Sequence, residues 1–113
     1  MPRLNSPVEA TIGIIGSKWK PSILLQLKDG LRGFNELRQC LPTITQRMLT
    51  LQLRALERDK IITLKVFETN PPAVEYAFSK YGFTLDPILG AFEHWCENNL
   101  GIKSLVQVET AEQ

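Results

Sequence analysis

The chain has 113 residues, of which 43% are hydrophobic and 22% are charged. This is the composition of an average globular protein and the length of about one domain. We expect one domain over residues 1–113, with its core in about 6–99 and a frayed tail after about 103. The apolar stretches are too short for a membrane span or a signal peptide, and two cysteines are too few for a disulfide scaffold. These features predict a cytoplasmic protein with reduced thiols and no membrane partner.

The net charge of +1 conceals an uneven distribution of charge along the chain. Residues 1–60 carry a net charge of +5, and residues 61–113 carry a net charge of −4. A basic half favours contact with a polyanion such as nucleic acid. A chance scatter of charges in a small protein is the alternative.

Apolar residues at helical spacing predict four helices in the first half of the chain. Pro7 suits the first turn of the first helix, and Gly30 suits the end of the second. Pro42 ends the third helix, and Thr45 is a good N-cap for the fourth because its hydroxyl can accept a free amide N–H. The helices expected here cover residues 7–16, 20–28, 34–41 and 45–59, and residues 31–33 form a connector or a single-bridge strand.

The second half of the chain predicts a β-hairpin and a last helix. Residues 61–68 and 74–78 have strand character, and the proline-containing segment 69–72 between them is a loop tip. Ser79 can cap a last helix over 80–99, in which Pro87 introduces a bend or a restart. Two helices on a short turn followed by a β-hairpin form a winged helix-turn-helix. The expected fold is therefore α+β and mainly helical: a winged helix-turn-helix with a two-stranded wing and a C-terminal dimerisation helix.

The fourth helix carries the clearest chemical signal. At about 100° per residue, its leucines fall on one face and its arginines fall on the opposite face. An arginine can bind a guanine edge bidentately, and a threonine or leucine methyl can pack on a thymine methyl. An ordinary solvated face is the alternative, but the tight helix-helix turn before this helix favours insertion into the major groove. The core positions are Leu49, Leu53 and Leu56, and the outward positions include Gln46, Arg47, Thr50, Leu51, Arg54 and Arg58.

Further contacts to DNA are expected outside this helix. The hairpin loop is a candidate wing in which Lys65 and Asn70 meet the backbone or the minor groove, although a simple proline-rich turn is the alternative. Lys18, Lys20 and Arg32 are better placed to add phosphate contacts, each of which steepens the salt dependence of binding. The complete set of predicted DNA-binding residues is Lys18, Lys20, Arg32, Asn35, Thr45, Gln46, Arg47, Thr50, Leu51, Arg54, Arg58, Lys65 and Asn70.

Five segments of the chain resemble the HxlR-type family of bacterial transcription regulators. They are PVEAT at 7–11, GSKWKP at 16–21, FNEL at 34–37, TQRMLTLQLR at 45–54 and PPAVEY at 71–76, within a similarity that extends over about 6–97. The resemblance implies a dimeric winged-helix protein that binds double-stranded DNA and pairs through its N- and C-terminal helices. It also implies repression or activation of a neighbouring operon in response to aldehydes, quinones or oxidants. The helix that begins at Thr45 would be the recognition helix.

The chain departs from this family at one position. Several members carry a redox-sensing cysteine just before the PVE run, where this chain has Ser6. A serine hydroxyl cannot form the thiolate that such a switch uses. Cys40 and Cys96 have the character of small buried hydrophobes rather than sensors. The thiol switch of those members is therefore not expected from position 6.

The last helix carries more apolar surface than one small core needs. A stripe that packs on its own domain is the alternative, but a second copy of the chain would bury the excess. A two-fold dimer places two recognition helices about 34 Å apart and predicts an inverted-repeat operator. A cleft of the dimer lined by Trp19, Phe92 or Trp95 is a candidate site for an aromatic effector. The predicted interface residues are Val8, Ile12, Leu85, Ile88, Leu89, Phe92, Trp95 and Cys96.

Two other classes of function are alternatives to a DNA-binding regulator. A winged helix used only for protein contact would direct its arginines at a partner's acidic surface and would not bind DNA specifically. An enzyme or metal protein is not expected, because His94, Cys96 and Cys40 fall short of a closed four-ligand zinc site and no catalytic motif is present. No cofactor is expected. MarR-like and ArsR-like regulators are the alternatives among DNA-binding proteins, and the five segments above favour the HxlR type.

Overall fold

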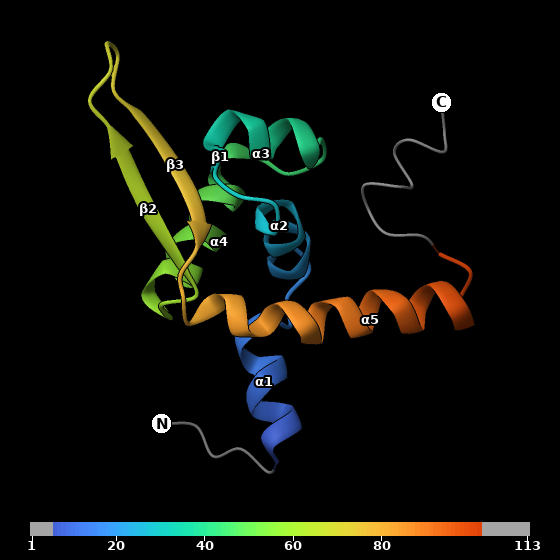
Figure 1. Ribbon diagram of the computed structural model, residues 1–113. Coiled ribbons are helices and arrows are strands. Elements are labelled where there is room, and N and C mark those ends of the chain that lie inside the picture. The colour runs from blue at the N-terminus through green and yellow to red at the C-terminus, as the bar shows by residue number, and fades with distance from the viewer. Residues whose placement is uncertain (1–5, 103–113) are drawn as a thin grey trace.

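A computed structural model describes residues 6–102 of the chain. In this part, the chain forms five α-helices and a small antiparallel sheet; the helices lie beside and below the sheet, whose hairpin projects from one end of the molecule (Figure 1). This arrangement confirms the predicted fold class; the predicted tail after residue 103 lies outside the described residues. The elements are α1 (Pro7–Ile15), α2 (Lys20–Leu27), β1 (Arg32–Gly33), α3 (Phe34–Cys40), α4 (Gln46–Arg58), β2 (Ile62–Phe67), β3 (Ala73–Phe78), the 3-10 helix η1 (Gly82–Leu85) and α5 (Asp86–Asn99).

Local hydrogen bonds explain where the helices begin. Ser6 caps α1 with its hydroxyl, which accepts the Glu9 backbone N–H at 3.1 Å. The Thr45 hydroxyl caps α4 in the same way by accepting the Met48 N–H at 3.0 Å, so the predicted N-cap is confirmed. Beyond α2, Gly30 has a φ of 133°, a conformation that only glycine adopts easily.

The sheet has the strand order β1-β3-β2, and both pairings are antiparallel. The short segment before α3 pairs with β3 through Arg32 opposite Tyr76 and Gly33 opposite Glu75. The wing therefore consists of two long strands plus a third, two-residue strand at its base. This third strand also holds the start of α3 close to the wing.

The core lies where α2, α3, α4 and the base of the wing meet α5. The three leucines predicted to face inward on α4 are at most 2% exposed, which confirms the orientation of that helix. Burial of these side chains stabilises the α3–α4 pair and directs the opposite face of α4 outward. The buried apolar residues are Ile15, Ile23, Leu24, Leu27, Leu37, Leu41, Ile44, Leu49, Leu53, Leu56, Ile61, Ile62 and Leu89.

The last helix begins later than predicted. Ser79 does not cap a helix at residue 80; its hydroxyl accepts the Gly82 N–H at 2.7 Å and donates to the Lys60 carbonyl oxygen at 2.6 Å. These bonds hold the end of the wing against the end of α4 and leave a 3-10 turn. The α-helix restarts at Asp86 with Pro87 in its first turn, because proline fits there without losing a hydrogen bond.

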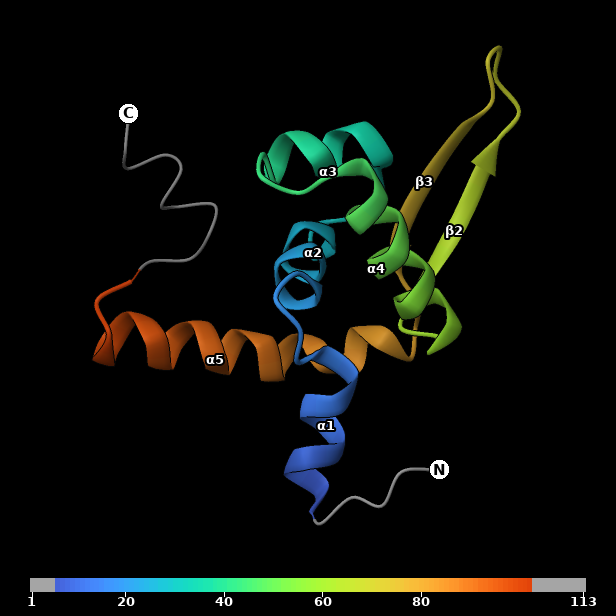
Figure 2. The ribbon, with the colours of Figure 1, turned by 180° about the vertical axis from the view of Figure 1, so that it is seen from behind.

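The helices α1 and α5 lie at the end of the molecule opposite the wing tip, as the two views show (Figures 1 and 2). The α5 helix divides its apolar residues between two sides. Leu89 is only 3% exposed within the chain's own core, and Leu85 packs against that core, so both contribute to the domain itself. This corrects the prediction that Leu89 is an interface residue. Among the described residues, no helix is long and apolar enough to cross a membrane.

Candidate nucleic-acid interface

The outward face of α4 forms one continuous polar surface. Its side chains border a single shallow hollow on the outside of the helix, so the structure brings five of the predicted DNA-binding residues together. The Thr50 hydroxyl donates to the Gln46 carbonyl oxygen at 2.9 Å, one turn earlier in the same helix. Leu51 is 49% exposed and presents an apolar side chain in the same row. The five residues are Gln46, Arg47, Thr50, Leu51 and Arg54.

The arginines of this face form no ion pair within residues 6–102, where the ion pairs are Lys28 with Glu93 and Arg32 with Glu36. Arg47, Arg54 and Arg58 are all exposed. A guanidinium without a carboxylate partner needs no internal contact to be broken before it binds an anion. The electrostatics of α4 therefore favour a negatively charged partner.

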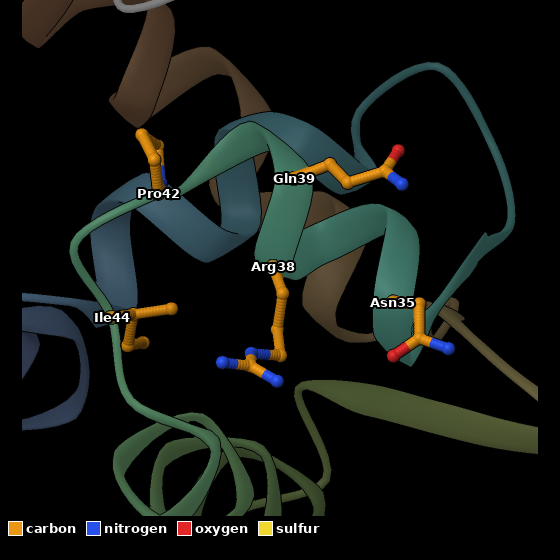
Figure 3. A pocket seen from close by; sticks show the side chains of 5 residues that line it. All are labelled: Asn35, Arg38, Gln39, Pro42 and Ile44. Carbon is orange, nitrogen blue, oxygen red and sulfur yellow. The ribbon is translucent and has the colours of Figure 1, made fainter.

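A second polar hollow lies beside the α3–α4 turn. Figure 3 shows the Arg38 side chain extending from α3 into this hollow, with Asn35 and Gln39 on the same helix. Pro42 and Ile44 of the turn complete its lining. Asn35 was predicted to contact DNA, whereas Arg38 was not. Arg38 directly follows Leu37, which is fully buried. This neighbouring core position is the sequence feature that could have placed Arg38 on the outward side of α3.

Two lysines near the start of α2, both predicted to contact phosphate, differ in how exposed their side chains are. Ser17 donates to the Gln52 side-chain oxygen at 3.4 Å, which holds the α1–α2 connector against α4. Lys18 on that connector is exposed, with its ammonium group 5.1 Å from the centre of the Trp19 ring. Lys20 is half-buried at the start of α2. Lys18 on the connector and Lys20 at the start of α2 therefore lie next to the point where Ser17 contacts α4.

Arg32 is less available than predicted. Its Nε donates to the Gln26 backbone carbonyl oxygen at 3.2 Å, and its guanidinium lies 3.7 Å from the Glu36 carboxylate. The side chain is therefore held at the base of the wing by two internal partners. A phosphate contact from Arg32 would have to compete with both.

The wing itself is only weakly basic. Lys65 extends over the Phe67 ring, with its ammonium group 5.2 Å from the ring centre, and Asn70 is exposed at the tip. Glu68 and Glu75 lie on the same hairpin and oppose the positive charge of Lys65. The strongest anion-binding surface therefore lies on α4 rather than on the wing.

The cysteines and the histidine do not gather into one cluster in the described part of the chain. Cys40 and Cys96 are free and half-buried. Within residues 6–102, no group of three or more His, Cys, Asp or Glu side chains is placed to hold a metal ion. His94 instead pairs with the Asn98 amide at 2.9 Å on the exposed side of α5.

Comparison with known proteins identifies the family. The model of the HxlR-like helix-turn-helix family matches residues 14–104. The chain belongs to this family. It is 52% identical over 91 residues to the HTH-type transcriptional regulator YdeP of Bacillus subtilis (strain 168), covering 80% of this chain and 71% of YdeP. It is also 48% identical to the HTH-type transcriptional regulator YybR of the same organism, covering 82% of this chain and 74% of YybR.

Solved structures agree with this assignment. The redox regulator HypR in its reduced form superposes with a TM-score of 0.81 at 49% sequence identity, covering 83% of this chain and 93% of HypR. Family and structure together place the HxlR chain among DNA-binding transcriptional regulators. The resemblance found in its sequence is thereby confirmed.

Proposed function

We propose that this HxlR-family protein is a sequence-specific regulator of transcription that binds an inverted-repeat operator as a homodimer. The observation that carries the proposal is the outward face of α4, directly after a helix-turn-helix turn. There Arg47 and Arg54, which form no ion pair within residues 6–102, flank Thr50 and Leu51. In the major groove, base pairs are distinguished by arginines that bind a guanine edge bidentately and by methyl-bearing side chains that pack on a thymine methyl.

The remaining polar residues divide into base contacts and phosphate contacts in this proposal. Gln46 lies at the N-terminal end of α4, the end that reaches base edges in helix-turn-helix proteins. Phosphate contacts come from Lys18 and Lys20, from the cap residue Thr45, and from the exposed side of α3. We add Arg38 to the phosphate contacts because its guanidinium occupies the hollow beside the α3–α4 turn. Arg58, Lys65 and Asn70 extend the contacts at the far end of α4 and on the wing.

The proposed dimer uses the apolar surface of α1 and α5. Val8 is 66% exposed, and Ile12 is 50% exposed one helical turn further on. On α5, Phe92 and Trp95 are more than half exposed. A cluster of large exposed apolar side chains on two helices is typical of a protein interface. We propose that a second copy covers this surface, together with Ile88 and Cys96, and sets the spacing of the two α4 helices.

The proposed regulation involves a small effector, in the class of reactive aldehydes, quinones or related compounds. HypR is described as a redox regulator. In this chain, Ser6 uses its hydroxyl to cap α1. The proposed response therefore does not use a thiol at position 6.

Fluorescence anisotropy tests DNA binding directly. The protein is titrated onto duplex DNA from beside its own coding region and onto a scrambled duplex, at low and near-physiological salt. We expect tight, sequence-dependent binding that weakens steeply with salt. Arg47→Ala should cost about 1–3 kcal/mol on the specific duplex only, whereas Lys80→Ala, which removes the same charge from an exposed site at the base of the wing, should cost little. Absence of binding to either duplex would favour the protein-contact alternative.

Sedimentation tests the dimer with a matched pair of aromatic substitutions. Trp95 and Tyr81 are each 59% exposed, but only Trp95 lies in the proposed interface. Trp95→Ala should shift the protein towards monomer, and Tyr81→Ala should leave the dimer intact. An unchanged dimer in both variants would place the interface elsewhere.

A further inference from the structure

A cavity of about 370 Å³ lies between α4 and the wing. It is more enclosed than the hollows on the outside of α4 and beside α3. Leu64 lies opposite Tyr76 in the hairpin, and Val74 precedes Tyr76 by two residues on the same strand. These three side chains therefore share one face of the wing. Phe34 and Leu53 close the cavity from the helical side. We call this cavity the wing groove.

The walls of the wing groove are mostly apolar, but four polar residues line it; Thr50 is one of them, with its hydroxyl already bonded to the Gln46 carbonyl oxygen. Arg54 and Glu57 line it from α4, and Tyr76 contributes its hydroxyl from β3. Burial raises the pKa of the Tyr76 hydroxyl, the Glu57 carboxylate raises it further, and Arg54 lowers it. Both charged side chains therefore act on the same hydroxyl. Within the described residues, the Arg54 side chain forms neither an ion pair nor a hydrogen bond.

This combination resembles a ligand site rather than a packing defect. Small-molecule sites are concave and mostly apolar, with a few polar groups that orient the ligand, and this volume is at the small end of their range. The rings of Phe34 and Tyr76 favour a flat aromatic ligand, since aromatic groups pack well against one another. The unpaired guanidinium of Arg54 favours an anionic group on that ligand. Glu57 can accept a hydrogen bond from a hydroxyl on the same molecule.

We propose that the wing groove binds a small aromatic acid, whose ring packs between α4 and the wing and whose carboxylate pairs with Arg54. This site differs from the predicted cleft of the dimer, and it belongs to a single copy of the chain. Arg54 and Thr50 also border the outward face of α4, so a ligand in the groove engages side chains that the operator needs. The ligand and DNA therefore compete. This last step rests on the proposed function, whereas binding of the acid does not.

Calorimetry and two-dimensional NMR with 4-hydroxybenzoate test the site without DNA. We expect saturable binding, with shifts concentrated at the amides of Thr50, Arg54, Leu64 and Tyr76. The neutral analogue 4-hydroxybenzyl alcohol and the variant Arg54→Gln should each lower the affinity about tenfold or more, because they remove one charge of the ion pair. Absence of saturable binding, or equal affinity in Arg54→Gln, would overturn the proposal. So would shifts confined to α1 and α5, because they would place the ligand at the proposed dimer surface.

A second pair of variants tests the cavity itself. Leu64→Trp fills the wing groove and should abolish binding of 4-hydroxybenzoate. Thr63→Trp adds the same side chain to the neighbouring residue of β2, which is exposed on the opposite face of the wing, and should retain binding. Binding to both variants would show that the acid occupies another site.

The competition is measured separately in the anisotropy assay. Saturating 4-hydroxybenzoate should weaken operator binding, and by reciprocity the operator should weaken binding of the acid by the same factor. An unchanged DNA titration alongside intact acid binding would overturn the competition alone. Acid binding by a chain that binds no duplex at all would overturn the proposed function and leave the wing groove as a ligand site.

Discussion

The contact between Gly82 and the start of β2 gives a sharp test of the fold. An ideal Cβ at Gly82 would lie 1.8 Å from the Ile61 carbonyl oxygen and 2.7 Å from its carbonyl carbon, where real Cβ atoms do not come closer than 3.0 Å. Ile61 cannot move away easily. Its side chain is 1% exposed in the core, and its carbonyl oxygen accepts the Ser79 backbone N–H at 2.9 Å.

Gly82→Ala must therefore separate two backbone segments by about 1.2 Å and strain the Ser79 bonds. Overpacking of this kind costs about 1–3 kcal/mol and occasionally more, and we expect the upper end because backbone rather than a flexible side chain must move. Urea unfolding followed by circular dichroism, at one protein concentration, measures the change. The control is Gly90→Ala, which meets no atom within 4 Å and should stabilise α5 by about 0.5–1 kcal/mol.

Gly82→Ala should lower the free energy of unfolding and Gly90→Ala should raise it, and these opposite effects make the test decisive. Both add one methyl group to the same region of the chain, so a general effect of alanine cannot produce them. A Gly82→Ala variant as stable as the unsubstituted protein would refute the close packing of η1 on Ile61. It would also refute our explanation of why α5 begins at Asp86.

Three further predictions concern single side chains. Thr45→Ala should lower the free energy of unfolding by about 1 kcal/mol, since the Met48 N–H loses its cap; thermal melting with Thr43→Ala as the exposed control measures this. Gln26→Met should raise stability by about 1 kcal/mol in urea titration, because the Gln26 amide nitrogen is buried without a hydrogen-bond partner among the described residues. Burial, assisted by Glu57, raises the pKa of Tyr76 above 10.0, so the unfolded chain loses this proton first. This contribution of Tyr76 to the free energy of unfolding is fully present below about pH 10 and is lost as the pH rises through the folded pKa. Tyr76→Phe should therefore lose less stability over this pH range, and equal losses in both proteins would contradict the prediction.

Short-range patterns in the sequence were sufficient to predict most of the elements and the main chemical face. The period of 3.6 residues separates leucines from arginines on α4 whatever packs around it, because side-chain direction follows directly from helix geometry. The Thr45 cap likewise depends on atoms three residues apart. For the same reason, the helix-turn-helix and the hairpin were recognisable before the structure was known.

The features that the sequence left open or placed differently all depend on segments far apart in the sequence. The pairing of β1 with β3, the hydroxyl of Ser79 on the end of α4, and the position of Leu89 in the core arise only when the chain is packed. Periodicity identified the apolar arc of α5 but not which edge of it meets the domain. Arg38 needed the α3–α4 turn in three dimensions to be placed in a hollow beside the recognition helix.

The wing groove shows most directly the difference between what local sequence patterns determine and what tertiary packing determines. Its walls come from α3, α4 and both strands of the wing, and none of these contributions is distinctive along the chain. Local chemistry determined what each side chain can donate, accept or bury. Tertiary packing alone decided which of them meet, because a groove between elements depends on distances between those elements and not on the order of residues.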